Sequence, residues 1–236
     1  MKKAILFDLD GTLLPMEQES FVKDYFGRMT RRLAPLGFSP KVFVDALWAG
    51  TAAMVKNDGT MTNEARFMAA FEQIFGERTA IAIRELDSFY LDEFDLVSES
   101  CGFDPEAKAA VDALSAMGYR LILATNPIFP RIATEKRIGW AGLSVSDFEL
   151  ITTYENSRHC KPNLDYYRDI LAECGIAPGE CIMVGNDVGE DMIAEKLGMD
   201  TFLITRNLIN RNDVDISQYK SGSLTDFVEY MRKNSL

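Results

Sequence analysis

The sequence contains few of the residues that build zinc sites and disulfide frameworks. Its 236 residues include a single histidine, His159, and four cysteines, no two of which have CxxC spacing. This composition excludes the common structural zinc patterns. Scattered cysteines without a disulfide framework are typical of proteins in a reducing compartment. We therefore expect a cytoplasmic protein.

Long apolar runs are also missing. No segment approaches the ~20 consecutive apolar residues that a membrane-spanning helix needs. The first residues, MKKAILFDLDGTLL, resemble a signal peptide in having two lysines before apolar residues. However, Asp8 and Asp10 interrupt the apolar stretch, and no small-residue cleavage site follows. The sequence predicts a soluble protein without a membrane partner.

Positive charge is scarce: 25 lysines and arginines stand against 36 aspartates and glutamates, a net charge of −11. A domain this acidic repels a phosphate backbone, which argues against nucleic acid as a partner. A small phosphorylated substrate is still compatible, because a bound metal ion can reverse the local field. Most of the acidic excess is explained by solubility alone.

What the chain does contain is the pattern of an α/β protein. Five short apolar runs without strict alternation indicate parallel strands buried between helices. These predicted strands are Lys3–Phe7, Arg120–Ala124, Phe148–Thr152, Cys181–Val184 and Thr201–Ile204. Helical patterns that end at glycine lie between the later strands, at Pro105–Met117, Asn163–Cys174 and Gly189–Leu197. The alternation predicts a doubly wound, Rossmann-like parallel sheet.

A long helical block interrupts this alternation after the first strand. Four amphipathic helices are predicted there, at Glu17–Pro35, Pro40–Val55, Thr62–Phe75 and Arg78–Phe94. We expect residues 1–15 and 96–236 to form the α/β core and residues 16–95 to form a small all-helical cap. Such a cap would cover the carboxyl edge of the sheet, where open α/β sheets bind their ligands.

Two aspartates, Asp8 and Asp10, directly follow the first predicted strand, in the sequence FDLDGT at residues 7–12. Carboxylates this close together repel one another unless a cation compensates them. Oxygen ligands of this kind suit Mg²⁺, which typically binds few carboxylates together with phosphate oxygens and water. An ordinary acidic turn has the same local composition, so this pair alone does not identify a metal site. The motifs that follow are needed to interpret it.

Three further polar motifs accompany the later elements. Thr125 and Asn126 end the second predicted strand, where a hydroxyl, an amide and helix N–H groups can hold a phosphate oxygen. Lys161 precedes a predicted helix and can neutralise carboxylates and a phosphoryl group. Asp187 and Asp191 follow the fourth predicted strand, at a spacing that allows both carboxylates to face one side. Taken singly, the first motif could be a turn, the second a solvated lysine and the third a helix cap. All of them, however, fall at the carboxyl ends of successive predicted strands, which favours one shared site.

Taken in order, FDLDGT, TN, KP and GND…D resemble the motifs of the haloacid dehalogenase superfamily, most of whose members are phosphatases. The helical block resembles the cap that this superfamily inserts after its first motif. The resemblance implies that Asp8 is the nucleophile and a metal ligand. It implies that Asp10 is the general acid and base and offers its backbone carbonyl to the metal. Thr125 and Lys161 would bind the phosphoryl oxygens, and Lys161 would also hold the charge of the nucleophile.

The resemblance assigns supporting roles as well. The backbone around Leu9, together with Asn126, would orient the phosphoryl group, and Asp187 would be the carboxylate ligand of Mg²⁺, with Asp191 supporting the site. Many members read Gly-Asp at the start of the fourth motif, whereas this chain reads Gly-Asn-Asp. Aligning Asn186 with that aspartate would shift the register. We prefer Asp187 as the ligand because a carboxylate binds Mg²⁺ more strongly than an amide does.

The expected function is Mg²⁺-dependent hydrolysis of a small phosphorylated metabolite through an aspartyl-phosphate intermediate. A sugar-phosphate mutase shares the same core and stays open. A dehalogenase needs no metal and typically lacks the second aspartate, so Asp10 argues against it. A phosphonate-cleaving enzyme would need a cap lysine, and none of Lys23, Lys41 and Lys56 stands out. A non-catalytic phospho-ligand-binding protein should have lost at least one chemical residue, and none is missing.

The predicted cap offers few substrate contacts that can be named from the sequence. Arg28, Arg31 and Arg32 on the first predicted cap helix are candidates for binding a second anionic group. Charged residues on a helix more commonly form a solvated face, and Trp48 is most simply a residue of the cap core. The motifs leave both a monomer and a homodimer open.

Overall fold

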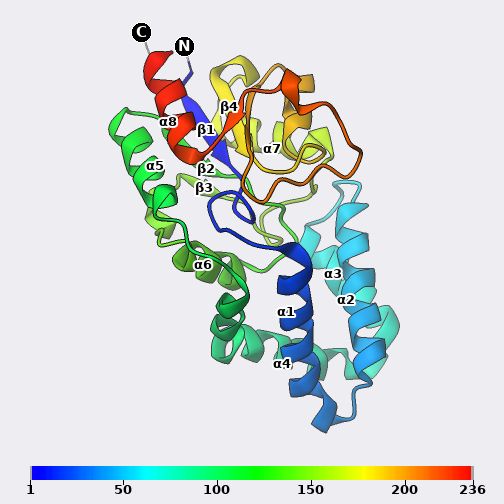
Figure 1. The fold of residues 1–236 in the computed structure, drawn as a ribbon. Coiled ribbons are helices and arrows are strands. Elements are labelled where there is room, and N and C mark those ends of the chain that lie inside the picture. The colour runs from blue at the N-terminus through cyan, green and yellow to red at the C-terminus, as the bar shows by residue number, and fades with distance from the viewer. Residues whose placement is uncertain (1, 235–236) are drawn as a thin grey trace.

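The computed structural model describes residues 2–234 and shows a six-stranded parallel sheet with helices on both faces (Figure 1). The strand order is β3-β2-β1-β4-β5-β6. The strands are β1 (Ala4–Phe7), β2 (Arg120–Leu123), β3 (Leu150–Ile151), β4 (Cys181–Gly185), β5 (Asp200–Ile204) and β6 (Ser221–Gly222). The predicted doubly wound fold is confirmed. The sheet also has β6, a strand too short and too polar for an apolar run to reveal it.

The central strands pack against different helices with alternate residues, as expected when both faces of a sheet are covered. The helices of the α/β part are α5 (Pro105–Ala116), α6 (Arg131–Trp140), α7 (Leu164–Cys174) and α8 (Leu224–Lys233). Ile5 and Phe7 of β1 pack in the cluster that contains residues of α5, α6 and α8, whereas Ala4 and Leu6 pack with α7. The core therefore lies in two layers, one on each face of the sheet.

The register of the central strands brings three chain segments to one edge. Phe7 at the end of β1 lies opposite Leu123 of β2 and Val184 of β4. The backbone N–H of Asp8 donates to the carbonyl of Val184 at 2.9 Å, which continues the pairing beyond the strand. The residues that follow β1, β2 and β4 consequently start at the same level.

The predicted helix at Gly189–Leu197 is wrong in its start and its type, because the structure has the 3₁₀-helix η6 (Met192–Leu197) there. Asp187 Oδ1 accepts hydrogen bonds from the backbone N–H groups of Gly189 at 2.8 Å and Glu190 at 3.0 Å, as the N-cap residue of a helix does. The turn that follows nevertheless continues as a 3₁₀-helix, and apolar spacing over so few residues does not distinguish the two helix types.

A helical block covers the carboxyl edge of the sheet, on the side toward which the strands of Figure 1 point. The helices of this block are α1 (Gln18–Leu33), α2 (Pro40–Val55), α3 (Asn63–Phe75) and α4 (Thr79–Asp92). Gly50 of α2 lets α2 and α3 approach closely, since a Cβ at this position would lie 2.4 Å from the ring of Phe67. Phe67 in turn stacks on Phe71, with ring centroids 4.5 Å apart.

Several contacts attach the helical block to the α/β part, and two of them are the chain crossings and Asn63. The two chain crossings lie side by side, since Met16 and Cys101 form a β-bridge. The second attachment is Asn63, the fully buried first residue of α3, which lies far from those crossings in the sequence. Its Nδ2 donates to the carbonyl of Pro127 at 3.1 Å, and its backbone N–H donates to the carbonyl of Ser157 at 2.8 Å. Asn63 therefore joins α3 directly to loops of the α/β part.

No helix in the described part of the chain is both long enough and apolar enough to cross a membrane.

Candidate active site

The segments that follow β1, β2 and β4 line one cavity of about 300 Å³ between the sheet edge and the helical block. Of the residues predicted for the site, six contribute to its lining: Asp8, Asp10, Thr125, Asn126, Asp187 and Asp191. The parallel register places them together, although they come from positions far apart in the sequence. Leu9 is fully buried, and its carbonyl accepts from the backbone N–H of Leu14 at 2.8 Å.

Lys161 lies behind this cavity and links two of the carboxylates. Its Nζ donates to Asp8 Oδ1 at 2.9 Å and to Asp191 Oδ1 at 2.6 Å, and only 1% of its side chain is exposed. Burial lowers the pKa of Lys161, but the charges of Asp191 and Asp8 outweigh burial and hold that pKa well above its usual value. The lysine is therefore a permanent cation beside the Asp8 carboxylate.

Asp191 is the second carboxylate that shares this ammonium group. Burial raises the pKa of Asp191 to about 6, against the attraction of Lys161, and the charge of Asp8 adds to the rise. The two carboxylates share one cation, so the three groups together carry excess negative charge. The arrangement favours a further positive charge in the cavity.

The other oxygen of Asp8 faces Thr12 and the segment after β4. Thr12 Oγ1 lies 3.2 Å from Asp8 Oδ2 and 3.0 Å from Asn186 Oδ1, so its single proton serves one acceptor at a time. Gly11 permits this contact. Its φ is +84°, and a Cβ there would lie 2.3 Å from Asn186 Nδ2. The glycine of the FDLDGT motif is therefore required by backbone conformation and by space.

Asp10 is paired with an arginine that the sequence analysis missed. Arg137 of α6 is completely buried, and its Nη1 donates to Asp10 Oδ2. The guanidinium also lies over the ring of Phe129, 4.2 Å from the centroid. The pKa of Asp10 is raised above its usual value, because the effect of burial outweighs the opposing effect of the Arg137 charge. A signal existed in the sequence, because Arg137 follows Ala133 by four residues and thus lies on the face of α6 that packs into the protein.

Asp187 is held by its own loop and by a second unpredicted arginine. While its Oδ1 caps the turn described above, its Oδ2 accepts from Arg211 Nη1 at 2.7 Å. Arg211 Nη2 also donates to Gln18 Oε1 of α1 at 3.1 Å. The segment around Arg211 reads as a polar connection, and no local pattern points from it to a residue 24 positions earlier in the chain.

Thr125 and Asn126 stand at the end of β2, facing the loop after β4. Asn126 Nδ2 donates to Glu190 Oε2 at 3.0 Å, whereas Asn126 Oδ1 is buried without a partner. Burial raises the pKa of Glu190 to about 7, against the attraction of Lys161. Glu190 also lines the cavity and was not among the predicted site residues.

The donor atoms suit a divalent metal ion in chemistry. Asp8 and Asp187 provide carboxylate oxygens around one cavity, which Asp10 also lines. Hard cations such as Mg²⁺ prefer oxygen ligands of this type. Within residues 2–234, no three histidine, cysteine, aspartate or glutamate side chains are already gathered as a metal cluster. Both oxygens of Asp187 accept hydrogen bonds from other groups of the protein.

Comparison with known proteins finds relatives over most of the chain. A family model described as haloacid dehalogenase-like hydrolase matches residues 2–196. A ribulose-1,5-bisphosphate 5-phosphatase of Halopiger xanaduensis is 29% identical over 86% of this chain and 84% of its own length. A phosphoserine phosphatase of Thermus thermophilus is 28% identical over 87% of this chain and 90% of its own length. The crystal structure of a 2-haloacid dehalogenase from Pseudomonas syringae aligns with a TM-score of 0.66 at 18% identity, over 99% of both chains.

Proposed function

The chain belongs to the family of haloacid dehalogenase-like hydrolases, and we propose that it is a phosphatase that hydrolyses the phosphate monoester of a small metabolite with Asp8 as nucleophile. The observation that carries this proposal is the pairing of two carboxylates, Asp8 and Asp10, in one cavity, with Lys161 Nζ 2.9 Å from Asp8. The names of the two curated relatives, a sugar-bisphosphate phosphatase and a phosphoserine phosphatase, support the reaction class.

The first half of the proposed reaction forms an aspartyl phosphate. A carboxylate oxygen of Asp8 attacks the phosphorus, the bond from phosphorus to the alcohol oxygen breaks, and the alcohol leaves with a proton from Asp10. Asp10 Oδ1 is the oxygen available for that proton, because Oδ2 is held by Arg137. The raised pKa of Asp10 favours its protonated form.

The second half returns the enzyme to its starting state. Water attacks the phosphorus, Asp10 takes up a proton from that water, and the bond from phosphorus to Asp8 breaks to release phosphate. Lys161 holds the carboxylate of Asp8 in place throughout and offsets negative charge on the phosphoryl oxygens. Thr125, Asn126 and the backbone around Leu9 would bind those oxygens at the cavity floor.

Mg²⁺ is the proposed cofactor, and the carboxylates of Asp8 and Asp187 with the backbone carbonyl of Asp10 would hold it. When bound, it would neutralise the phosphoryl oxygens and fix their orientation. Asp191 would support the site through Lys161, to which it is bonded at 2.6 Å. We also propose that residues 16–95 act as a cap on a core formed by residues 1–15 and 96–236, since the helical block closes one side of the cavity.

The test is phosphate release from a panel of monoesters, with and without Mg²⁺, by the parent protein and two variants. Asp8→Asn should abolish turnover, and Asp10→Asn should slow it by about 10²–10⁴-fold. Asp112→Asn, which alters an exposed carboxylate on α5, serves as the matched control. Undiminished release by the folded Asp8→Asn variant would rule out the mechanism. Interconversion of sugar phosphates without net phosphate release would instead identify a mutase.

A further inference from the structure

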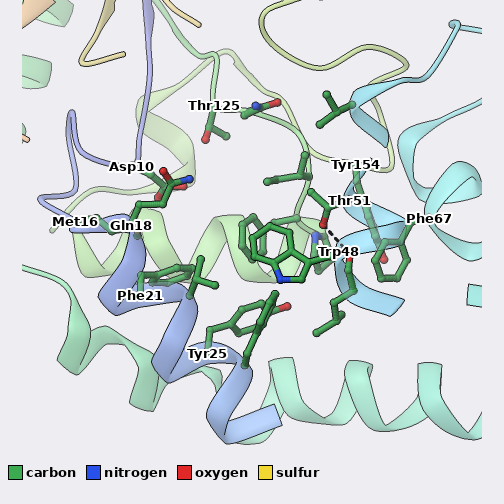
Figure 2. Close-up of a pocket in the computed structure, with 18 of the residues that line it drawn as sticks. Asp10, Met16, Gln18, Phe21, Tyr25, Trp48, Thr51, Phe67, Thr125 and Tyr154 are labelled. Atoms are coloured by element: carbon green, nitrogen blue, oxygen red, sulfur yellow. Dashed lines mark hydrogen bonds between the residues drawn. The ribbon is translucent and has the colours of Figure 1, made fainter. Parts of the chain in front are cut away.

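The half of the cavity away from Asp8 is built almost entirely from apolar and aromatic side chains of the helical block. Phe21, Val22, Tyr25 and Phe26 lie on one face of α1, at the i, i+1, i+4 and i+5 spacing of a helical stripe. Figure 2 shows the rings of Phe21, Tyr25 and Trp48 together, with Asp10 and Thr125 toward the upper left. A leaving group attached to a phosphate at Asp8 would extend onto these rings.

Positive charge is missing from this apolar wall. Among the described residues that line the cavity, Arg211 is the one lysine or arginine, and it pairs with Asp187 at the sheet edge. Of the three arginines of α1 that were candidates for a second anion, Arg31 is exposed and lies outside the cavity lining, and the other two have partners. Arg28 pairs with Asp24 and Glu99. Arg32 pairs with acidic residues of α4 and the turn after it: Glu85, Asp92 and Glu93.

Most polar groups of the same wall are already hydrogen-bonded. The exception is Asp87 of α4, an exposed carboxylate that also lines the cavity and adds negative charge to it. The hydroxyls of Tyr25 and Tyr90 bond to each other. Thr51 Oγ1 donates to the carbonyl of Leu47 at 2.9 Å, and Gln18 Oε1 accepts from Arg211. Burying hydroxyl or charged groups of a ligand without partners carries a large desolvation cost. The wall therefore disfavours leaving groups that carry further negative charge, and it offers few partners to a leaving group with several hydroxyls.

We infer that this site takes the phosphate monoester of an uncharged, largely apolar alcohol of about the size of one ring. This inference rests on the proposed phosphatase function and deepens it. The cavity volume of about 300 Å³ is at the lower end of ligand pockets, ~300–1,000 Å³, which leaves space for a single ring beside the phosphate. Trp48 forms the exposed end of the wall and is not the cap-core residue that the sequence suggested: it is 50% exposed and packs edge-on against Phe26, with centroids 5.3 Å apart.

The test compares three esters of primary alcohols, so that differences in leaving-group acidity stay small. 2-Phenylethyl phosphate should show a kcat/KM at least about tenfold above those of glycerol 1-phosphate and O-phosphoserine. Its phenyl ring is buried against apolar side chains, whereas the polar groups of the other two esters would be buried there without partners. A preference for either polar ester would overturn the inference and leave the phosphatase function intact. No hydrolysis of any ester by folded, Mg²⁺-supplied protein would count against both.

Two variants make the comparison specific to the apolar wall. Trp48→Ala should reduce the ratio of kcat/KM for 2-phenylethyl phosphate over glycerol 1-phosphate by about tenfold. Phe103→Ala is the matched control, because Phe103 is 60% exposed and lies outside the cavity lining. Val55→Lys, which adds a cation to an exposed position of the wall, should shift the preference toward O-phosphoserine. An equal ratio in the parent, Trp48→Ala and Val55→Lys proteins would refute the inference.

Discussion

Replacing Arg137 with methionine should destabilise the protein mainly through the charge left on Asp10. The guanidinium is fully buried, whereas 30% of the Asp10 side chain is accessible from the cavity. Methionine keeps much of the volume of the arginine stem, so little packing is lost. Asp10 Oδ1 already lacks a partner, and the substitution removes the arginine that donates to Oδ2.

The magnitude follows from the burial of the pair. Breaking a buried ion pair by removing one partner costs ~3–5 kcal/mol, and we expect about 3 kcal/mol here because Asp10 is partly accessible. Burial already raises the pKa of Asp10, and Arg137 is the main group that opposes this rise. Without the arginine, the pKa rises further and Asp10 takes up a proton more readily. The loss of stability should therefore be smaller at pH 5 than at pH 8.

Urea unfolding followed by circular dichroism at both pH values measures this effect, with a chelator present to exclude bound metal. The series comprises Arg137→Met, Asp10→Asn and the double variant. The double variant removes both charges and should be about 2 kcal/mol more stable than the sum of the single effects predicts. Arg120→Met is the control, because Arg120 pairs with Glu149 at the surface and should contribute less than ~1 kcal/mol.

Additive single effects, within about 0.5 kcal/mol, would show that the two side chains are not coupled. A loss in Arg137→Met no larger than that in Arg120→Met would show that the Asp10 charge is adequately solvated from the cavity. Either result would refute the reasoning about this ion pair.

Three further substitutions test other parts of the site. Burial raises the pKa of Glu190 to about 7, so its contribution to stability is present below its unfolded pKa of about 4.5 and is lost as the pH rises through 7. Without metal, Glu190→Gln should therefore be more stable than the parent protein by roughly 2–3 kcal/mol at pH 8 and equal to it near pH 4; parallel pH profiles in urea unfolding would contradict this. Arg211→Ala frees one oxygen of Asp187 and should lower the Mg²⁺ concentration for half-maximal phosphate release by about threefold, the value of an exposed ion pair; a higher Mg²⁺ requirement would speak against the proposed ligand. Asn63→Ala leaves the buried Nδ2 of Asn57 without one acceptor and should lower the free energy of unfolding by about 2 kcal/mol; an unchanged melting temperature would show that water replaces the lost bonds.

The sequence was sufficient to predict five of the six strands and the residues at the edge of the sheet, because both depend on local patterns. A short apolar run between turn residues specifies a buried strand, and parallel strands necessarily bring their carboxyl ends to one edge. Asp8, Thr125 and Asp187 follow strands that are adjacent in the sheet, so their convergence on one cavity could be anticipated. The same reasoning predicted the helices of the block from their apolar periodicity.

Side-chain pairs between distant segments could not be anticipated in this way. Arg137 and Asp10 are 127 positions apart, and their contact depends on how α6 packs beside the sheet edge. Arg211 reaches Asp187 from a connection without regular structure. The helix predicted after β4 was wrong in its start and its type, because the segment forms a turn and then a 3₁₀-helix of six residues. Over so short a segment, apolar periodicity does not distinguish a 3₁₀-helix from an α-helix.

The contacts between the helical block and the α/β part limit how the cavity can open. They include the bridge between Met16 and Cys101 and the buried junction at Asn63. Lys136 of α6 adds a third contact, because it donates to the carbonyl of Leu91 at 3.1 Å and to Asp95 at 2.6 Å. The block therefore cannot lift away from the sheet without breaking polar contacts, those of Asn63 among them. Exchange of substrate and product by movement of the block would then depend on the strength of these contacts, which links the stability of the junction to turnover.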